Sequence, residues 1–238
     1  MWSSARSEAS LEAGLPVPID VRPLKTARRF RLRFDEATGR LTLTCPARAS
    51  RRAALAWAAE QHEWIEAQLA RAEPPEPFAP GAMIPVEGRD VRLVWRPAAS
   101  RAPILADDTL SCGGPIEGFA RRIETVLKRR ALELMSREAA SFAEAAGVTV
   151  AAISIGDPGS RWGSCSSARR IRLSWRLILA PSEVRRFVVA HEVAHLVHLN
   201  HGAEFKALEA RLFGPGLAQA RAELRLVGPR LRRIGRGR

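Results

Sequence analysis

The first regular pattern along the chain is an alternation of apolar and basic side chains between residues 30 and 34. Apolar residues at every second position predict a half-buried β-strand. A second alternating run covers residues 41–44, after a turn at residues 37–39 and before Pro46. Together the two runs predict a β-hairpin.

A helical pattern follows the hairpin. Apolar residues recur at helical spacing over residues 51–69, and Ser50 stands where an N-cap is expected. Trp57 and Trp64 are two turns apart on this helix, which favours packing in a core or between domains over a ligand site. The proline-rich segment 73–77 then ends the helix, because no helix or central strand continues through such a sequence.

The second half of the chain mixes short strand patterns with long helical ones. The longest helix should stop at Gly147, since glycine readily adopts the left-handed conformation that ends helices. In chain order we expect two strands within residues 83–95, a helix over 116–146, strands over 148–155 and 171–176, and a helix over 181–199.

These elements predict an α+β protein in two parts, separated by an irregular, turn-rich stretch at about residues 98–114. The first part is a small β-rich subdomain with one helix, and the second contains the long helices. We expect these divisions: a poorly ordered leader over residues 1–24, the hairpin and helix subdomain over 25–98, a second domain over 115–225 and a basic tail over 226–238.

The net charge says more about possible binding partners than the rest of the composition does. A hydrophobic content of 46% is ordinary for a globular protein, whereas the formal net charge of +13 is not. Such a surface attracts polyanions and acidic proteins, so non-specific association with nucleic acid is expected. Charge alone does not identify a binding site.

Three features bear on the compartment. Cys45, Cys112 and Cys165 are far apart and make neither a disulfide framework nor a zinc knuckle. Acidic residues interrupt the first twenty positions, and no run of about eighteen apolar residues occurs, so we predict no secretory signal and no membrane span. A reducing, cytoplasmic location fits these features best.

Four of the five histidines lie between residues 191 and 201. His191 and His195 are four residues apart on a predicted helix, so both imidazoles project from one face toward a single ion. Glu192 is turned about 100° from His191, which suits contact with a water molecule on that ion better than ligation. This is the H-E-x-x-H arrangement of two metal ligands and a general base.

A catalytic zinc site needs three protein ligands and one free position. His201 is the favoured third ligand, because a left-handed turn at Asn200 would fold the chain back toward the ion. His198 lies a further turn along the helix and would have to bend back to reach it. Glu204 and Glu209 are the next candidates.

The block Arg161-Trp162-Gly163-Ser164-Cys165-Ser166, taken with the histidine cluster, resembles the YgjP-like metallopeptidases. That family is related to the SprT-like and WLM proteases among the zincins. The resemblance extends over about residues 25–215 and includes the segments 171–177 and 201–205. One departure is Lys206, at a packing or rim position where the family commonly has tryptophan.

The resemblance implies a minimal zincin-like catalytic domain over residues 115–225, with an active-site helix, a backing helix and a small sheet. It also implies a zinc ion on His191, His195 and His201, with Glu192 as the general base. Family membership specifies the metal site better than it specifies the substrate.

In the mechanism that these residues predict, zinc activates a water molecule, Glu192 accepts its proton, and a polarised carbonyl group is attacked. Arg161, Ser164 and Arg176 are candidates for binding the substrate and its oxyanion. They lie on or near the strand and loop that resemble the substrate edge of a zincin. Cys165 has no evident activating pair, so we interpret it as a buried or structural thiol.

The leading hypothesis is a zinc peptidase that acts on proteins or peptides. A zinc hydrolase of another amide or of an ester would use the same water activation. The third hypothesis is a non-catalytic basic protein that uses zinc for stability and associates with nucleic acid. Glu192 argues against this last hypothesis, because a structural zinc site needs no base.

Overall fold

The computed structural model describes residues 14–35 and 39–237. Contacts divide the described chain into two compact units, one ending at Pro75 and the other running from Glu76 to Arg236. The boundary therefore differs from the one predicted at residues 98–114. That stretch supplies two strands to a sheet of the second unit, and their shortness made it look irregular in the sequence.

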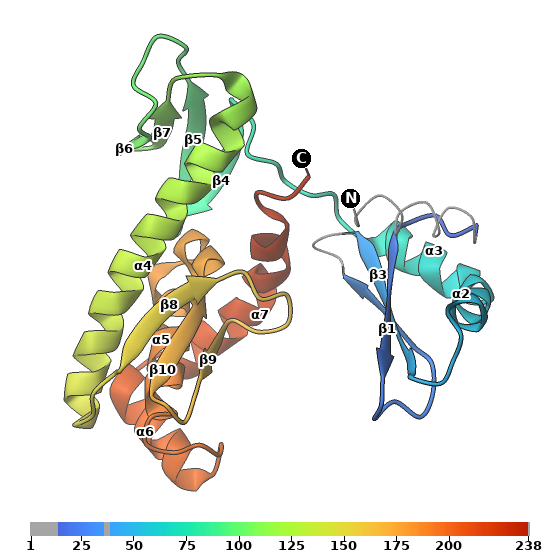
Figure 1. Cartoon of the computed structure of the whole chain (residues 1–238). Helices are drawn as coiled ribbons and strands as arrows, with labels where there is room; N and C mark the ends of the chain where they lie inside the picture. Colours follow the sequence, from blue (N-terminus) through green and yellow to red (C-terminus); the bar gives the residue numbers. More distant parts are fainter. Residues whose placement is uncertain (1–13, 36–38, 238) are drawn as a thin grey trace. The chain divides into compact units, whose positions relative to one another are not determined.

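The first unit is a three-stranded sheet with two helices packed against it (Figure 1). The predicted hairpin is present, with its two strands paired antiparallel from Arg31↔Thr44 to Asp35↔Arg40. The strand order is β1-β3-β2. The elements are β1 (Ile19–Leu24), β2 (Arg31–Asp35), β3 (Arg40–Pro46), α2 (Arg51–Ala59) and α3 (His62–Arg71).

Strand β1 corrects the prediction of a disordered leader for the part of it that the structure describes. β1 pairs parallel with β3, and Leu15 and Ile19 are buried in the core of this unit. The pairing joins segments some twenty residues apart, so local patterning gave no sign of it. The rest of the predicted leader, residues 1–13, lies outside the described residues.

The predicted helix over residues 51–69 is two helices, because α2 ends at Ala59 and α3 begins at His62. The Ser50 side chain accepts a hydrogen bond from the backbone N–H of Ala53 at 3.1 Å, as predicted for an N-cap. Trp57 stacks on Phe30 with ring centroids 5.4 Å apart. Trp64, in contrast, is 40% exposed.

The second unit contains two sheets and four α-helices (Figure 1). One sheet has the order β4-β5-β7-β6 and the other the order β8-β10-β9. Its strands are β4 (Met83–Val86), β5 (Arg89–Trp95), β6 (Ile104–Ala106), β7 (Thr109–Cys112), β8 (Ala152–Gly156), β9 (Gly163–Cys165) and β10 (Arg170–Ser174). Its helices are α4 (Phe119–Ala146), α5 (Ser182–Ala194), α6 (Ala203–Phe213) and α7 (Leu217–Arg233), with 3₁₀ turns η1 (Ile116–Gly118) and η2 (Trp175–Leu179).

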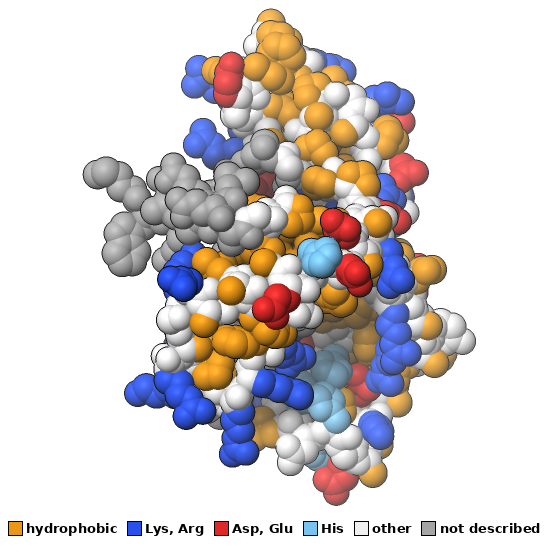
Figure 2. All heavy atoms as spheres, turned by 90° about the vertical axis from the view of Figure 1, so that its right-hand side faces the viewer, with side chains coloured by type: hydrophobic (Ala, Val, Ile, Leu, Met, Phe, Trp, Pro, Cys, Tyr) orange, Lys and Arg blue, Asp and Glu red, His pale blue; other side chains and the backbone are white. Residues whose placement is uncertain are grey.

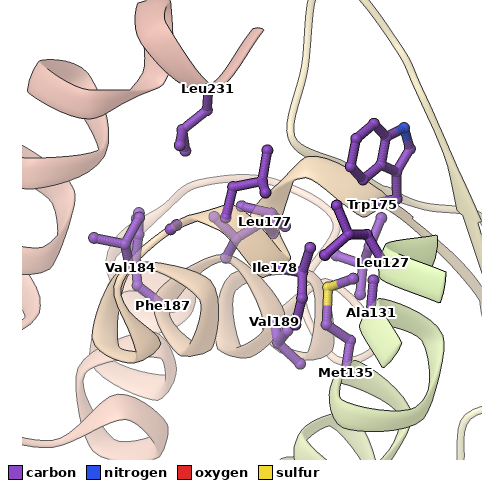
Figure 3. Packing of buried hydrophobic residues seen from close by; sticks show 14 of the residues in the cluster. Leu127, Ala131, Met135, Trp175, Leu177, Ile178, Val184, Phe187, Val189 and Leu231 are labelled. Atoms are coloured by element: carbon purple, nitrogen blue, oxygen red, sulfur yellow. The ribbon is translucent and has the colours of Figure 1, made fainter. Parts of the chain in front are cut away.

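The long helix α4 supports the helix that carries the histidines. It ends at Gly147, which has a φ of 68° and caps the helix as predicted. Figure 3 shows Ala131 and Met135 of α4 packed with Ile178 of η2 and Val189 of α5. These side chains are almost completely buried. Removing such contacts costs several kcal/mol per side chain, so α5 is held firmly in place.

An ion pair reinforces this packing. The Arg185 guanidinium on α5 donates to the Glu138 carboxylate on α4 at 2.8 Å, and the Arg185 side chain is only 5% exposed. The helix α5 ends at Ala194, earlier than the predicted residue 199, and His195 is its C-cap. The fold is α+β, as predicted, with the histidine-bearing helix α5, the long helix α4 behind it and a small sheet.

The C-terminal segment is not a free basic tail. Residues 226–233 form the last part of α7, and Leu231 and Ile234 are buried. Ile234 forms a parallel bridge with Glu76. Two apolar positions that insert into the core thus fix a segment whose charge suggested a solvated tail. No helix in the described part of the chain is long and apolar enough to cross a bilayer.

Candidate metal centre

Three histidines meet at one point on the surface of the second unit. The Nε2 atom of His201 lies 3.1 Å from Nε2 of His195 and 3.3 Å from Nε2 of His191. All three ligand atoms are within 4.8 Å of one another. Histidine side chains can be seen gathered on one face in the space-filling view (Figure 2).

These spacings fit a tetrahedral metal ion. Zinc binds imidazole nitrogens at about 2.0–2.1 Å, which places two nitrogens of a tetrahedral site about 3.3 Å apart. Three imidazoles with a fourth position left open form the ligand set of a catalytic zinc site. The group His191, His195 and His201 could therefore hold a metal ion.

His201 reaches the site by a route that differs from the prediction. The chain leaves α5 after Ala194 and runs through turns to His201, which lies just before α6. Asn200 has no positive φ, so it is not the left-handed turn that we expected. The helix ends five residues early, and this gives the chain room to return without one. His198 contributes its backbone carbonyl, which accepts a hydrogen bond from Nδ1 of His195 at 3.0 Å.

The Nδ1 atoms of His191 and His195 both contact protein groups. Nδ1 of His191 is 2.7 Å from the Glu209 carboxylate, and Glu209 is only 1% exposed. Arg221 of α7 donates to the second oxygen of Glu209 at 2.6 Å. Glu209, considered above as a possible metal ligand, therefore contacts Nδ1 of His191, the ring nitrogen that points away from the cluster. Such a partner fixes the tautomer and the orientation of a metal-binding imidazole.

Phe205 forms the apolar floor of the site. Its ring centroid lies 5.1, 4.6 and 4.7 Å from those of His191, His195 and His201. Phe205 is 2% exposed and comes from α6. One buried ring thus contacts all three imidazoles and limits their rotation.

Charges around the site keep the groups in forms that suit a cation. Burial lowers the pKa of His195, and the neighbouring imidazoles act in the same direction, so the neutral ring that metals bind is favoured. Burial would raise the pKa of Glu209, but the hydrogen bond and charge of His191 and the charge of Arg221 hold it below its ordinary value. The carboxylate of Glu209 is therefore ionised at neutral pH.

Glu192 lies on α5, next to His191, and is 5% exposed. Burial raises the pKa of its carboxyl group to about 7, although the charges of His191 and Arg161 act in the opposite direction. Gly163 of β9 packs directly against this side chain. A Cβ built on Gly163 would lie 2.6 Å from Cγ and 2.7 Å from Cδ of Glu192, so no larger residue fits there without displacing the carboxylate.

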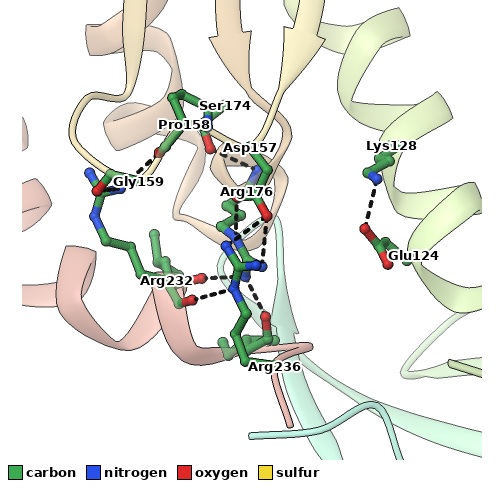
Figure 4. Close-up of polar contacts among 11 residues, drawn as sticks. Glu124, Lys128, Asp157, Pro158, Gly159, Ser174, Arg176, Arg232 and Arg236 are labelled. Carbon is green, nitrogen blue, oxygen red and sulfur yellow. Dashed lines mark hydrogen bonds and ion pairs between the residues drawn. The ribbon is translucent and has the colours of Figure 1, made fainter. Parts of the chain in front are cut away.

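The three predicted substrate-binding residues have different positions. Arg161 is exposed and close enough to Glu192 for its charge to act on that carboxyl group. Ser164 lies in β9, opposite Arg172 of β10. Arg176 does not belong to the site: its side chain is 3% exposed and donates to Asp157 at 2.7 Å and to the carbonyl of Leu231 at 3.0 Å (Figure 4).

Arg176 lies away from the site because the backbone changes direction just before it. The predicted strand through residue 176 ends at Ser174, and the following 3₁₀ turn directs Arg176 inward against α7. Cys165 is a free thiol that is half-buried rather than buried. Burial and the charge of Glu192 raise its pKa, which disfavours the thiolate and therefore a role as a nucleophile.

Two contributors were not predicted from the sequence: Gly163, which leaves space for the Glu192 side chain, and Arg221, which pairs with Glu209. A glycine inside a strand often marks a close approach of another group, so Gly163 carried a usable signal. Arg221 is twenty residues beyond the last histidine, and nothing local distinguishes it from the other arginines.

A family model described as "YgjP-like, metallopeptidase domain" matches residues 28–226. The match spans both units and includes the three histidines, Glu192 and Gly163. No curated protein and no solved structure matches the chain.

Proposed function

The chain belongs to the YgjP-like metallopeptidase domain family, and from this premise we propose that it is a zinc-dependent metallopeptidase. One observation carries the proposal. The Nε2 atoms of His191, His195 and His201 converge beside α5, and α5 also contains the buried Glu192. Three imidazoles favour zinc among the common divalent ions. A structural zinc site would tend to recruit a fourth protein ligand and would need no buried carboxylate beside it.

When bound, zinc would supply two effects, the activation of a water molecule and the polarisation of the carbonyl group under attack. The protein supplies the proton transfers. Glu192 accepts the proton of the attacking water on a carboxylate oxygen and passes it to the leaving amine. Gly163 and the burial of Glu192 hold this carboxylate in one place, which is what general base catalysis requires.

Arg161 is the best candidate for stabilising the negative charge that develops on the carbonyl oxygen. It is exposed and its charge reaches Glu192, so it can approach a substrate bound at the same place. A guanidinium aimed at a developing oxyanion lowers the barrier because the charge interaction is strongest in the transition state. Arg176 cannot take this role, because its guanidinium is buried and paired with Asp157.

The position of β9 favours an extended peptide as the substrate. β9 is an edge strand, and among the described residues its strand partner is β10. Its other edge is therefore able to pair with a peptide that adds as a further strand. Because Gly163 in β9 contacts Glu192, such a peptide would pass close to the general base.

Two substrates tested side by side separate the peptidase from a hydrolase of other amides or esters. We expect the zinc-loaded protein to cleave casein, to lose this activity on chelation and to regain it with one equivalent of zinc. Hydrolysis of p-nitrophenyl acetate without cleavage of casein would favour the alternative hydrolase. Bound zinc with neither activity would overturn the catalytic proposal in favour of a structural role.

Two matched histidine variants test which residues bind the metal. His201→Ala removes a nitrogen of the cluster, whereas His198→Ala removes an imidazole that lies outside it. We expect His201→Ala to bind zinc far more weakly than the parent, and His198→Ala to retain it, since the His198 contact with His195 uses only the backbone. Equal zinc binding by both variants would contradict the assignment of His201.

A further inference from the structure

The first unit contains a groove that the hydrolase proposal does not use. It has a volume of about 520 Å³, within the range of about 300–1,000 Å³ typical of ligand sites. The groove lies where the edge strand β2 meets the helix pair. Its lining residues are Arg29, Phe30, Arg31, Leu32, Trp57, Gln61 and Trp64.

Aromatic rings make up much of the groove. Phe30 and Trp57 are stacked, with 29° between their planes, and this pair is anchored in the core of the unit. Trp64 keeps 40% of its surface exposed at the groove. Burying a tryptophan is strongly favourable, so an exposed tryptophan beside two other rings indicates a surface that binds something flat or apolar.

The polar residues of the groove are cationic or neutral. Arg29 and Arg31 are exposed, and no carboxylate partner of either occurs among the described residues. Gln61 lies at the break between α2 and α3, where its amide can both donate and accept hydrogen bonds. None of the described residues that line the groove is acidic.

Further arginines lie on the neighbouring strands, on the face of the sheet that points away from the core. Arg31 is paired with Thr44 of β3, and Thr44 is paired in turn with Arg22 of β1. Arg33 follows Arg31 two residues along the strand and so lies on the same face. It stands opposite Thr42. These arginines share the face of the sheet opposite to Leu32, which packs on the core. Asp20, opposite Thr42, lies on that face too and forms an ion pair with Arg22 at 2.8 Å, so the arginines that belong to the groove itself are Arg29 and Arg31.

We propose that this groove, with Arg29 and Arg31 in its lining, binds single-stranded nucleic acid. Sequence-tolerant sites of this kind combine aromatic rings, on which bases stack, with cations that follow the phosphates. The net charge of +13 is complementary to such a polyanion. An acidic peptide would use the arginines but not the three rings, and a duplex keeps its bases stacked inside and away from tryptophan.

The inference does not depend on the proposed hydrolase activity. Every lining residue belongs to the unit that ends at Pro75, whereas the histidines and Glu192 belong to the other unit. The test is therefore a binding measurement on the full chain, and its result is independent of whether casein is cleaved.

Fluorescence anisotropy with a labelled 20-nucleotide oligothymidine, measured at several salt concentrations, tests the site. Trp64→Ala should weaken binding about 5- to 100-fold, because one stacking contact is lost, and leave the salt dependence unchanged. Trp64→Phe should keep most of the affinity. The double variant Arg29→Ala/Arg31→Ala should reduce the slope of log K against log salt by about 1.4, as expected for the loss of two phosphate contacts.

Controls separate the groove from general basicity. Arg51→Ala/Arg52→Ala removes the same charge from residues outside the lining, and it should have a smaller effect on the affinity. Circular dichroism verifies that each variant is folded. Absence of binding at low salt, equal affinity in Trp64→Ala and the parent, or stronger competition by polyglutamate or by a 20-base-pair duplex would overturn the proposal.

Discussion

Gly163 lies against the carboxylate of Glu192, so closely that a methyl group at position 163 would come within 2.7 Å of the Glu192 Cδ. The two residues come from different elements, the edge strand β9 and the helix α5. The glycine is needed for space, because its φ is not in the left-handed region. β9 therefore sets the position of the proposed general base.

Gly163→Ala should consequently impair catalysis without removing the metal. We expect kcat/KM for casein to fall about 100-fold, because a displacement of about 1 Å at a catalytic group has an effect of that size. Zinc content should remain one per chain. Gly202→Ala is the matched control, since a Cβ there meets nothing within 4 Å. Full activity in Gly163→Ala would show that the Glu192 carboxylate is not held by β9.

Glu209→Gln should weaken zinc binding about 10- to 100-fold, because it removes the charge that orients His191 and makes it more basic. Competition with a chromophoric chelator measures this affinity directly. Glu204→Gln serves as the control: Glu204 is 86% exposed and pairs with His198, outside the cluster. Equal losses in the two variants would indicate a general effect of negative charge.

Arg161→Ala should lower kcat by about 100-fold while zinc binding and stability stay unchanged, since Arg161 is an exposed residue proposed to act on the oxyanion. Arg176→Ala should behave differently and lower the free energy of unfolding, because its guanidinium is buried among Asp157 and two carbonyl groups. Unchanged kcat in Arg161→Ala would remove it from the mechanism.

The ion pair of Asp157 and Arg176 predicts a pH dependence of stability. Burial would raise the pKa of Asp157, but the hydrogen bond and charge of Arg176 and the charge of Arg236 hold it below 3.8. The unfolded chain therefore binds this proton more readily than the folded chain does. The stabilisation by Asp157 is complete above about pH 5 and is lost as the pH falls below about 4 toward the folded pKa.

Asp157→Asn should lower the free energy of unfolding at pH 7 by about 3 kcal/mol, as expected when one partner of a largely buried ion pair is lost. It should also flatten the decline in stability as the pH falls below about 5. Urea unfolding across this range measures both effects. Glu133→Gln, in an ion pair whose side chains are 65–67% exposed, should change stability by less than about 0.5 kcal/mol. A parallel decline in Asp157→Asn and the parent would contradict the assignment.

The features that depend on local spacing were predictable from the sequence. His191 and His195 are four residues apart on a helix, and that spacing alone brings two imidazoles to one face. Ser50 and Gly147 were recognisable as helix ends because capping depends on a single residue type at a single place.

Features that depend on tertiary contacts were not predictable in this way. β1 pairs with a strand twenty residues away, and Arg221 meets Glu209 only because α7 returns beside α6. Arg176 resembled a surface residue on an alternating strand, yet a 3₁₀ turn directs it into the core. In each case the partner, rather than the residue itself, decides the role.

The central claim is most directly tested by measuring zinc content and casein hydrolysis on the same preparations of the parent and of Glu192→Gln. The substitution keeps the size of the side chain and removes only its ability to accept a proton. We expect one zinc per chain in both proteins and cleavage of casein by the parent alone. Cleavage of casein by Glu192→Gln at the rate of the parent would contradict the account.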